Sequence, residues 1–127
     1  SQVDEALALA VFRQRDRILG ERRTHLAHNL QLTGNWVARH AAHVEWVRPD
    51  AGALCCVRLK REVFDAAAVE RFYAALARRS TRVAPGAWFG DEPRVFRLGF
   101  GLLPPEEPAM ALECVSSALT EAAQAGT

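Results

Sequence analysis

Apolar residues recur at spacings of four, seven or eight along the first third of the chain, which places most of them on one helix face. Ser1 and Asp4 form a capping-box pattern, so we predict a helix over residues 4–40. Gly20 and Gly34 favour a kink or a break in this helix. A helix of ~35 residues spans roughly 50 Å, more than a small domain needs for itself. The periodic apolar positions are Leu7, Val11, Ile18, Leu26, Leu30 and Val37.

After this helix the apolar period shortens to two in several segments, which indicates strands. Proline and glycine in the segment 49–52 indicate a hairpin turn, and Asp65 is a good N-cap for a second helix. We predict strands over residues 43–48 and 53–60, a helix over 65–79, strands over 81–84 and 95–102, and a last helix over 106–123.

The order α-β-β-α-β-β-α predicts an α+β fold. We expect a two-layer sandwich in which a small, mainly antiparallel sheet carries the helices on one face. Residues 1–40 would form a long helix of the interdomain type, and residues 41–127 the α+β domain. Because the chain opens directly into this helix and has no initiator methionine, we expect it to be a piece of a longer protein.

Composition narrows the function classes. Half of the 127 residues are hydrophobic and the net charge is +1, so we expect a folded protein with no general attraction to nucleic acid or to an anionic membrane. No apolar run approaches the ~20 residues of a membrane span, and no signal peptide is visible, so we expect a cytoplasmic protein.

The metal-binding and nucleophilic residue types show no site pattern. The three cysteines include an adjacent pair and no C-x-x-C, so we expect free thiols rather than disulfides or zinc ligands. The histidines lack an acid at ligand spacing, so we predict no metal site. Ser116 and Ser117 have no histidine or acid at positions that suggest a triad, and we assign them no role. The residues considered are Cys55, Cys56, Cys114, His25, His28, His40 and His43.

One strand combines an arginine with glycines. In the segment 95–102, Phe96, Leu98, Phe100 and Leu102 alternate with Val95, Arg97, Gly99 and Gly101, so we expect the first set in the core and the second on the other face. Two interpretations of Arg97 remain. It binds a carboxylate with its planar fork in the space that the glycines leave, or it is a solvated arginine at a bend.

Several short segments, in their order along the chain, resemble segments of a known family. Arg82 to Gly90 reads RVAPGAWFG, and Arg94 to Gly101 reads RVFRLGFG. Upstream lie the long helix, the segment VEWVRPDAGA at 44–53 and its second strand. Together these segments resemble the C-terminal small domain of class I/II (fold type I) pyridoxal-phosphate-dependent aminotransferases, over nearly the whole chain.

The resemblance implies a small domain that closes over the active site, in a dimeric, cytoplasmic enzyme of amino-acid metabolism. The implied substrates are amino acids and 2-oxo acids, of broad specificity, and the implied partners are the missing large domain of the same chain and a second subunit. Arg97 falls on the arginine that binds the substrate α-carboxylate. Pro85 and Gly86 fall on the turn near the mouth of the site.

The resemblance also implies what is missing. It places the lysine that binds pyridoxal phosphate in the large domain, so Lys60, the only lysine here, is not its counterpart, and we predict no cofactor-binding residue in this chain. The chain alone would be inactive. Two alternatives stay open: the effector-sensing aminotransferase-like domain of a transcription regulator, and a sister enzyme of the same fold such as a carbon–sulfur lyase or a decarboxylating synthase.

Overall fold

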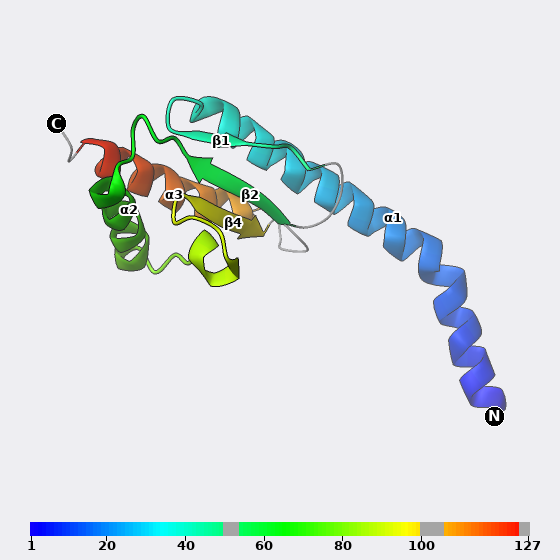
Figure 1. Ribbon diagram of the computed structural model, residues 1–127. Coiled ribbons are helices and arrows are strands. Elements are labelled where there is room, and N and C mark those ends of the chain that lie inside the picture. The colour runs from blue at the N-terminus through cyan, green and yellow to red at the C-terminus, as the bar shows by residue number, and fades with distance from the viewer. Residues whose placement is uncertain (50–53, 100–105, 125–127) are drawn as a thin grey trace.

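A computed structural model describes residues 1–49, 54–99 and 106–124, and the side chains from residue 109 onward in the last range. Figure 1 shows a small sheet packed against helices, with one long helix that extends away from it. The elements are α1 (Gln2–Arg39), β1 (Val44–Trp46), β2 (Leu54–Leu59), α2 (Ala66–Arg78), β3 (Ala84–Pro85), the 3₁₀ turn η1 (Gly86–Phe89), β4 (Val95–Gly99) and α3 (Glu106–Gln124).

The long first helix forms as predicted, and neither glycine breaks it. The Ser1 hydroxyl accepts a hydrogen bond from the Asp4 amide at 3.2 Å, which caps the first turn. Only the C-terminal part of α1 reaches the core, where Trp36 and Val37 are buried. The N-terminal part projects into solvent (Figure 1) and leaves large apolar side chains exposed, among them Val3, Leu7, Val11 and Phe12.

The sheet is antiparallel throughout and has the strand order β1-β2-β4-β3. The central strands β2 and β4 pair with Cys56 opposite Arg97. The described part of the strand predicted over 95–102 ends at Gly99, and Phe100, Gly101 and Leu102 lie outside the described residues.

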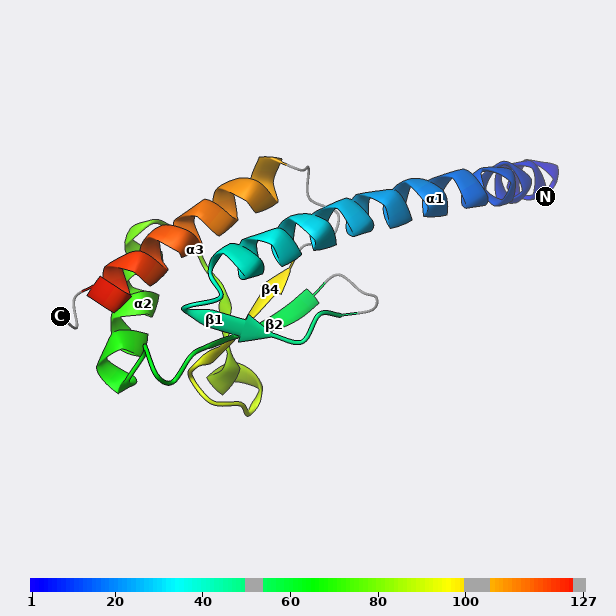
Figure 2. The same cartoon turned by 90° about the horizontal axis from the view of Figure 1, so that it is seen from above.

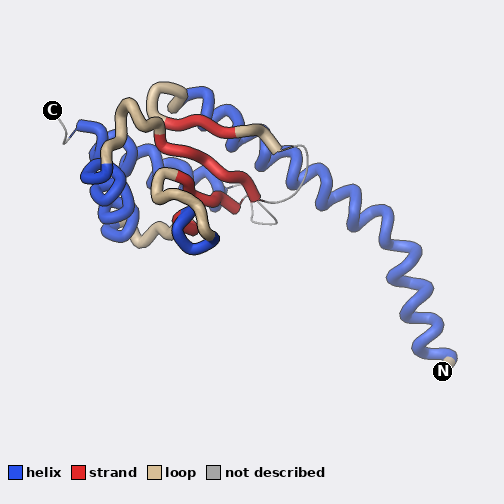
Figure 3. Tube along the Cα trace, in the orientation of Figure 1, coloured by secondary structure: helices blue, strands red, loops and turns tan. Residues whose placement is uncertain are grey.

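Helices cover one face of this sheet, as predicted. α3 packs against α2 and against the end of α1 (Figures 2 and 3). Trp36 Nε1 donates to the Leu112 carbonyl oxygen at 3.1 Å, and an ion pair joins Arg78 of α2 to Glu121 of α3. The largest fully buried side chains are those of Trp36, Phe64, Phe72, Phe96, Leu59, Leu76 and Leu119. The molecule is therefore a two-layer α+β sandwich.

The edge strands differ from the prediction. The strand predicted over 81–84 forms instead at Ala84–Pro85, and β1 is shorter than the predicted segment 43–48. Pro85 can occupy β3 because that strand lies at the edge of the sheet, where a missing N–H donor leaves no neighbour unpaired. Within residues 1–49, 54–99 and 106–124, no helix combines the length and apolarity that a membrane span requires.

Candidate functional site

The face of the sheet opposite the helices carries the candidate site. Along β2 the side chains alternate, with Cys55, Val57 and Leu59 buried and Leu54, Cys56 and Arg58 exposed. The cross-strand partners of the exposed set on β4 are Gly99, Arg97 and Val95. Because paired residues share a face, Arg97 lies on the open face beside Cys56, as the alternation along β4 predicts.

Arg97 is half-buried and contacts an aromatic ring. Its guanidinium carbon Cζ lies 4.1 Å from the ring centroid of Phe89, within the range of a cation–π interaction. Among the residues that the structure describes, no acceptor lies within hydrogen-bond distance of the Arg97 guanidinium, and no carboxylate forms an ion pair with it. Within the described part of the chain, the donors of this arginine are therefore available to a ligand.

The turn before β4 brings Phe89 to Arg97. After β3 the chain enters η1, and Gly90 follows with a positive φ of 82°, a conformation that favours glycine. Asp91 N donates to the Gly86 carbonyl oxygen at 2.8 Å and closes the turn. A Cβ on Gly86 would collide with the Glu92 carbonyl and would lie 2.9 Å from that of Val95. Glycine is thus required at position 86 for the chain to fold back this tightly.

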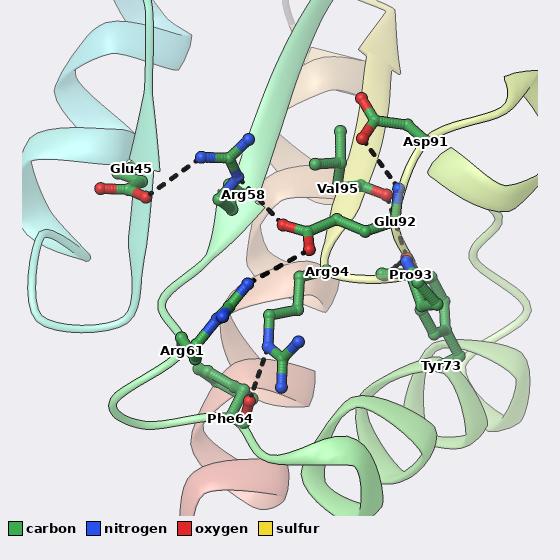
Figure 4. A network of polar contacts seen from close by, with 10 residues as sticks. All are labelled: Glu45, Arg58, Arg61, Phe64, Tyr73, Asp91, Glu92, Pro93, Arg94 and Val95. Atoms are coloured by element: carbon green, nitrogen blue, oxygen red, sulfur yellow. Dashed lines mark hydrogen bonds and ion pairs between the residues drawn. The ribbon is translucent and has the colours of Figure 1, made fainter.

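Ion pairs hold the end of this turn, at Glu92, against β2 and the residues that follow it, as Figure 4 shows. Glu92 forms ion pairs with Arg58 at 3.3 Å and with Arg61 at 3.6 Å, and Arg58 also reaches Glu45 of β1 at 3.8 Å. The network leaves Arg58 with two carboxylate partners, whereas Arg97, on the same face, has none among the described residues.

Tyr73 of α2 ties the same turn to the helical layer. Its hydroxyl donates to the Pro93 carbonyl oxygen at 2.7 Å (Figure 4). Burial raises the pKa of Tyr73 to about 12, so the hydroxyl keeps its proton at physiological pH and remains a donor. The start of β4 is thereby held from both layers of the sandwich.

A shallow depression of about 410 Å³ opens on this face. It adjoins the Arg97 row through Cys56 and carries both acidic and basic groups. Apolar side chains stand beside these charged groups in the lining. Its lining includes Glu45, Trp46, Cys56, Arg58, Asp91 and Val95.

Comparison with known proteins gives a structural match only. No family profile and no curated protein sequence matches the chain. The solved PLP-dependent cyclase OrfR is similar over 87% of this chain and 30% of its own, with 33% identity and a TM-score of 0.71. A PLP-dependent aminotransferase from Streptococcus suis matches over 93% and 30%, with 23% identity and a TM-score of 0.74. The α-aminoadipate aminotransferase LysN from Thermus thermophilus matches over 91% and 30%, with 18% identity and a TM-score of 0.69.

The chain has the small-domain fold of pyridoxal-phosphate-dependent aminotransferases. It spans about 30% of the length of each of these three solved chains. The match confirms the fold that the resemblance implied. The role assigned to Arg97 stays a prediction, because structural similarity at this level does not test a ligand contact.

The chain contains one lysine, Lys60. Lys60 directly follows the last residue of β2 and lies four residues beyond Cys56. At about 3.3 Å per strand residue, this places it roughly 13 Å from the row that holds Arg97.

The structure corrects the interpretation of Ser116. The sequence suggested no histidine near it, yet Ser116 Oγ lies 2.8 Å from His40 Nε2 and 2.7 Å from Trp36 Nε1. Burial, and then the charges of His43 and Arg39, lower the pKa of His40, so the imidazole is neutral at physiological pH. No group of three metal-binding side chains, and no carboxylate against this cluster, occurs within the described ranges. The contacts join α1 to α3, and the cluster is structural.

The cysteines are free, as predicted. Cys55 is buried on the covered face, and burial, with a smaller contribution from Cys56, raises its pKa to about 12. Cys56 is exposed on the open face. No pattern in the sequence predicted the stack of Phe89 on Arg97 or the ion pairs of Glu92. The signal for the stack was the aromatic pair that follows Pro85-Gly86 by one residue.

Proposed function

We propose that this chain is the substrate-carboxylate-binding small domain of a PLP-dependent aminotransferase. The observation that carries the proposal is Arg97, a half-buried arginine on the uncovered sheet face with no acceptor among the described residues. A guanidinium donates two parallel hydrogen bonds to a carboxylate, which both amino acids and 2-oxo acids carry. Arg97 thus fits the group that the two substrates of a transamination share.

The uncovered surfaces support a role within a larger enzyme. The apolar side chains on the projecting part of α1 form an exposed strip that a neighbouring large domain or second subunit would cover. The open sheet face would close over the substrate from the side opposite the cofactor. By itself the chain would be inactive, because the resemblance places the lysine that binds the cofactor in the large domain.

The experiment is to replace Arg97 in the full-length enzyme. Arg97→Ala removes charge-assisted hydrogen bonds worth about 1.5–3 kcal/mol, so kcat/KM for amino acids falls by about ten- to a few-hundred-fold. Arg97→Lys keeps the charge but loses the planar fork, so it is also impaired. Activity toward an amine that lacks the carboxylate falls far less. Equal loss toward both substrates would show that Arg97 is structural.

A second reaction class has a specific observation behind it. The neighbour with 33% identity is a PLP-dependent cyclase, so a reaction on a single amino-acid substrate is a second candidate for the parent enzyme beside transamination. Turnover that requires a 2-oxo acid as amino acceptor supports transamination. Turnover of an amino acid without any acceptor supports the second class, and Arg97 binds the carboxylate in both.

A further inference from the structure

Among the described residues, Phe89 is the one whose ring lies against the guanidinium of Arg97. Its ring centroid lies 4.1 Å from Arg97 Cζ, and this is the one stacking contact that Arg97 makes within the described part of the chain. Phe89 itself is 36% exposed, whereas Trp88, next to it on the same turn, is 75% exposed. Phe89 therefore lies against the arginine rather than inside the hydrophobic core.

A ring in this position restricts the arginine without using its hydrogen-bond donors. All five N–H groups of a guanidinium lie in its plane, and an aromatic ring binds over the face of that plane. The edge that matches a carboxylate stays free, while the stack limits the rotamers that a long side chain would otherwise sample. Such a side chain loses less conformational entropy when the ligand binds.

The protein holds Phe89 firmly enough to do this. The turn that carries it is closed by the Asp91–Gly86 hydrogen bond, and Gly86 packs directly against the backbone that follows. Glu92 anchors the end of the turn to β2 through Arg58 and Arg61 (Figure 4). The same ion pairs keep Arg58 occupied, so they leave Arg97 as the arginine available to a carboxylate among the described residues of the sheet.

From this arrangement we infer that Phe89 is a positioning residue, which sets the orientation of the Arg97 fork toward the substrate carboxylate. The inference rests on the proposed carboxylate role of Arg97. Phe89 acts through Arg97, so its effect is confined to ligands that carry a carboxylate. The contact exists before the ligand arrives, so its loss weakens binding and leaves kcat nearly unchanged.

The test uses the full-length enzyme with pyridoxal phosphate bound. The probes are the standard L-amino acid that most changes the absorbance of the bound cofactor, and the amine of the same skeleton without the carboxylate. Phe89→Leu keeps an apolar side chain but removes the aromatic face, and we expect it to raise Kd and KM for the amino acid by about three- to tenfold. Phe89→Tyr restores a ring and recovers most of the affinity. Binding of the amine is unchanged.

Trp88→Leu is the matched control, since it removes an aromatic ring from the same turn without touching the stack of Phe89 on Arg97. It leaves Kd for the amino acid unchanged, and urea unfolding of all three variants verifies that the fold is retained. Equal losses from Phe89→Leu and Trp88→Leu, or equal losses toward amino acid and amine, would overturn the inference.

A double-mutant cycle separates this inference from the proposed function. When Arg97 is alanine, Phe89→Leu has no further effect on Kd if Phe89 acts through Arg97, and a full second loss refutes the positioning role. If Arg97→Ala itself causes no carboxylate-specific loss, or if no L-amino acid perturbs the wild-type cofactor, the proposed function fails. A selective loss from Arg97→Ala with none from Phe89→Leu contradicts the inference alone.

Discussion

The two faces of one strand show how differently neighbouring residues of this protein are used. On β2, Cys55, Val57 and Leu59 lie under the helices, and Cys56 and Arg58 face away from them. The covered positions need only apolar side chains of suitable volume, because the core is held by packing. The open face carries the charged side chains of Arg58 and Arg97, whose contacts with Glu92 and Phe89 depend on the position of those particular residues. The covered face therefore accounts for the fold, and the open face for the candidate site.

The sharpest expected difference between the two faces is chemical. Cys55 and Cys56 are adjacent along the chain. The thiolate is the form of a cysteine that reacts, and burial raises the pKa of the Cys55 thiol from an ordinary value of 9.0 to about 12. The thiolate fraction of Cys55 at pH 8 is therefore about a thousandfold below that of an ordinary thiol, following a factor of ten per pKa unit. We expect iodoacetamide to alkylate Cys56 while Cys55 stays unmodified until the protein unfolds. Peptide mass spectrometry over time measures both, and equal rates in the native protein would contradict the assignment of faces.

Stability provides the next contrast, between adjacent residues of β4. Phe96 is 0% exposed and packs against Phe72, with ring centroids 5.3 Å apart, so Phe96→Ala is expected to cost about 3–5 kcal/mol. Arg97→Ala removes one cation–π contact on the open face and is expected to cost less than about 1 kcal/mol. Urea unfolding followed by tryptophan fluorescence compares them. A large cost for Arg97→Ala would mean that the open face also holds the fold.

The covered face could be predicted from the sequence because it obeys a local period. The alternation along β4 placed Phe96 in the core and Arg97 opposite, and the structure agrees. The strand at Pro85 was misplaced because its position depends on being the edge of a sheet, which no local pattern specifies. The long helix was predictable from its apolar spacing, although only its end is packed against the rest of the chain.

The open face could be predicted only in part, because its contacts join residues without any regular spacing. Arg97 was identified from its own strand and from the resemblance. Its stack on Phe89 depends on the path of an irregular turn, and the pairing of Glu92 with Arg58 joins residues 34 positions apart. His40 and Ser116 are 76 positions apart and meet only because α1 packs on α3. Such pairs follow from the tertiary fold and not from any local period.

The smallest expected effect concerns the turn between β3 and β4. Two glycine substitutions are compared, one in this turn and one in α1. At Gly86 an added Cβ would meet the carbonyls of Glu92 and Val95, which are backbone atoms of the same tight turn and cannot rotate away. We expect Gly86→Ala to destabilise the chain by about 1–3 kcal/mol, as overpacking does. Gly20 lies in the exposed part of α1, where an added Cβ would have no neighbour within 4 Å, so Gly20→Ala is expected to stabilise by roughly 0.5–1 kcal/mol through helix propensity.

The opposite signs make this pair informative, because both substitutions add the same methyl group to the same chain. Urea midpoints of the two variants measure the difference directly. In the full-length enzyme, Gly86→Ala also displaces Phe89, so it should weaken amino-acid binding as Phe89→Leu does, whereas Gly20→Ala should not. If Gly86→Ala were neutral in both measurements, the turn could relax at little cost, and the rigid placement of Phe89 against Arg97 would not depend on glycine at position 86.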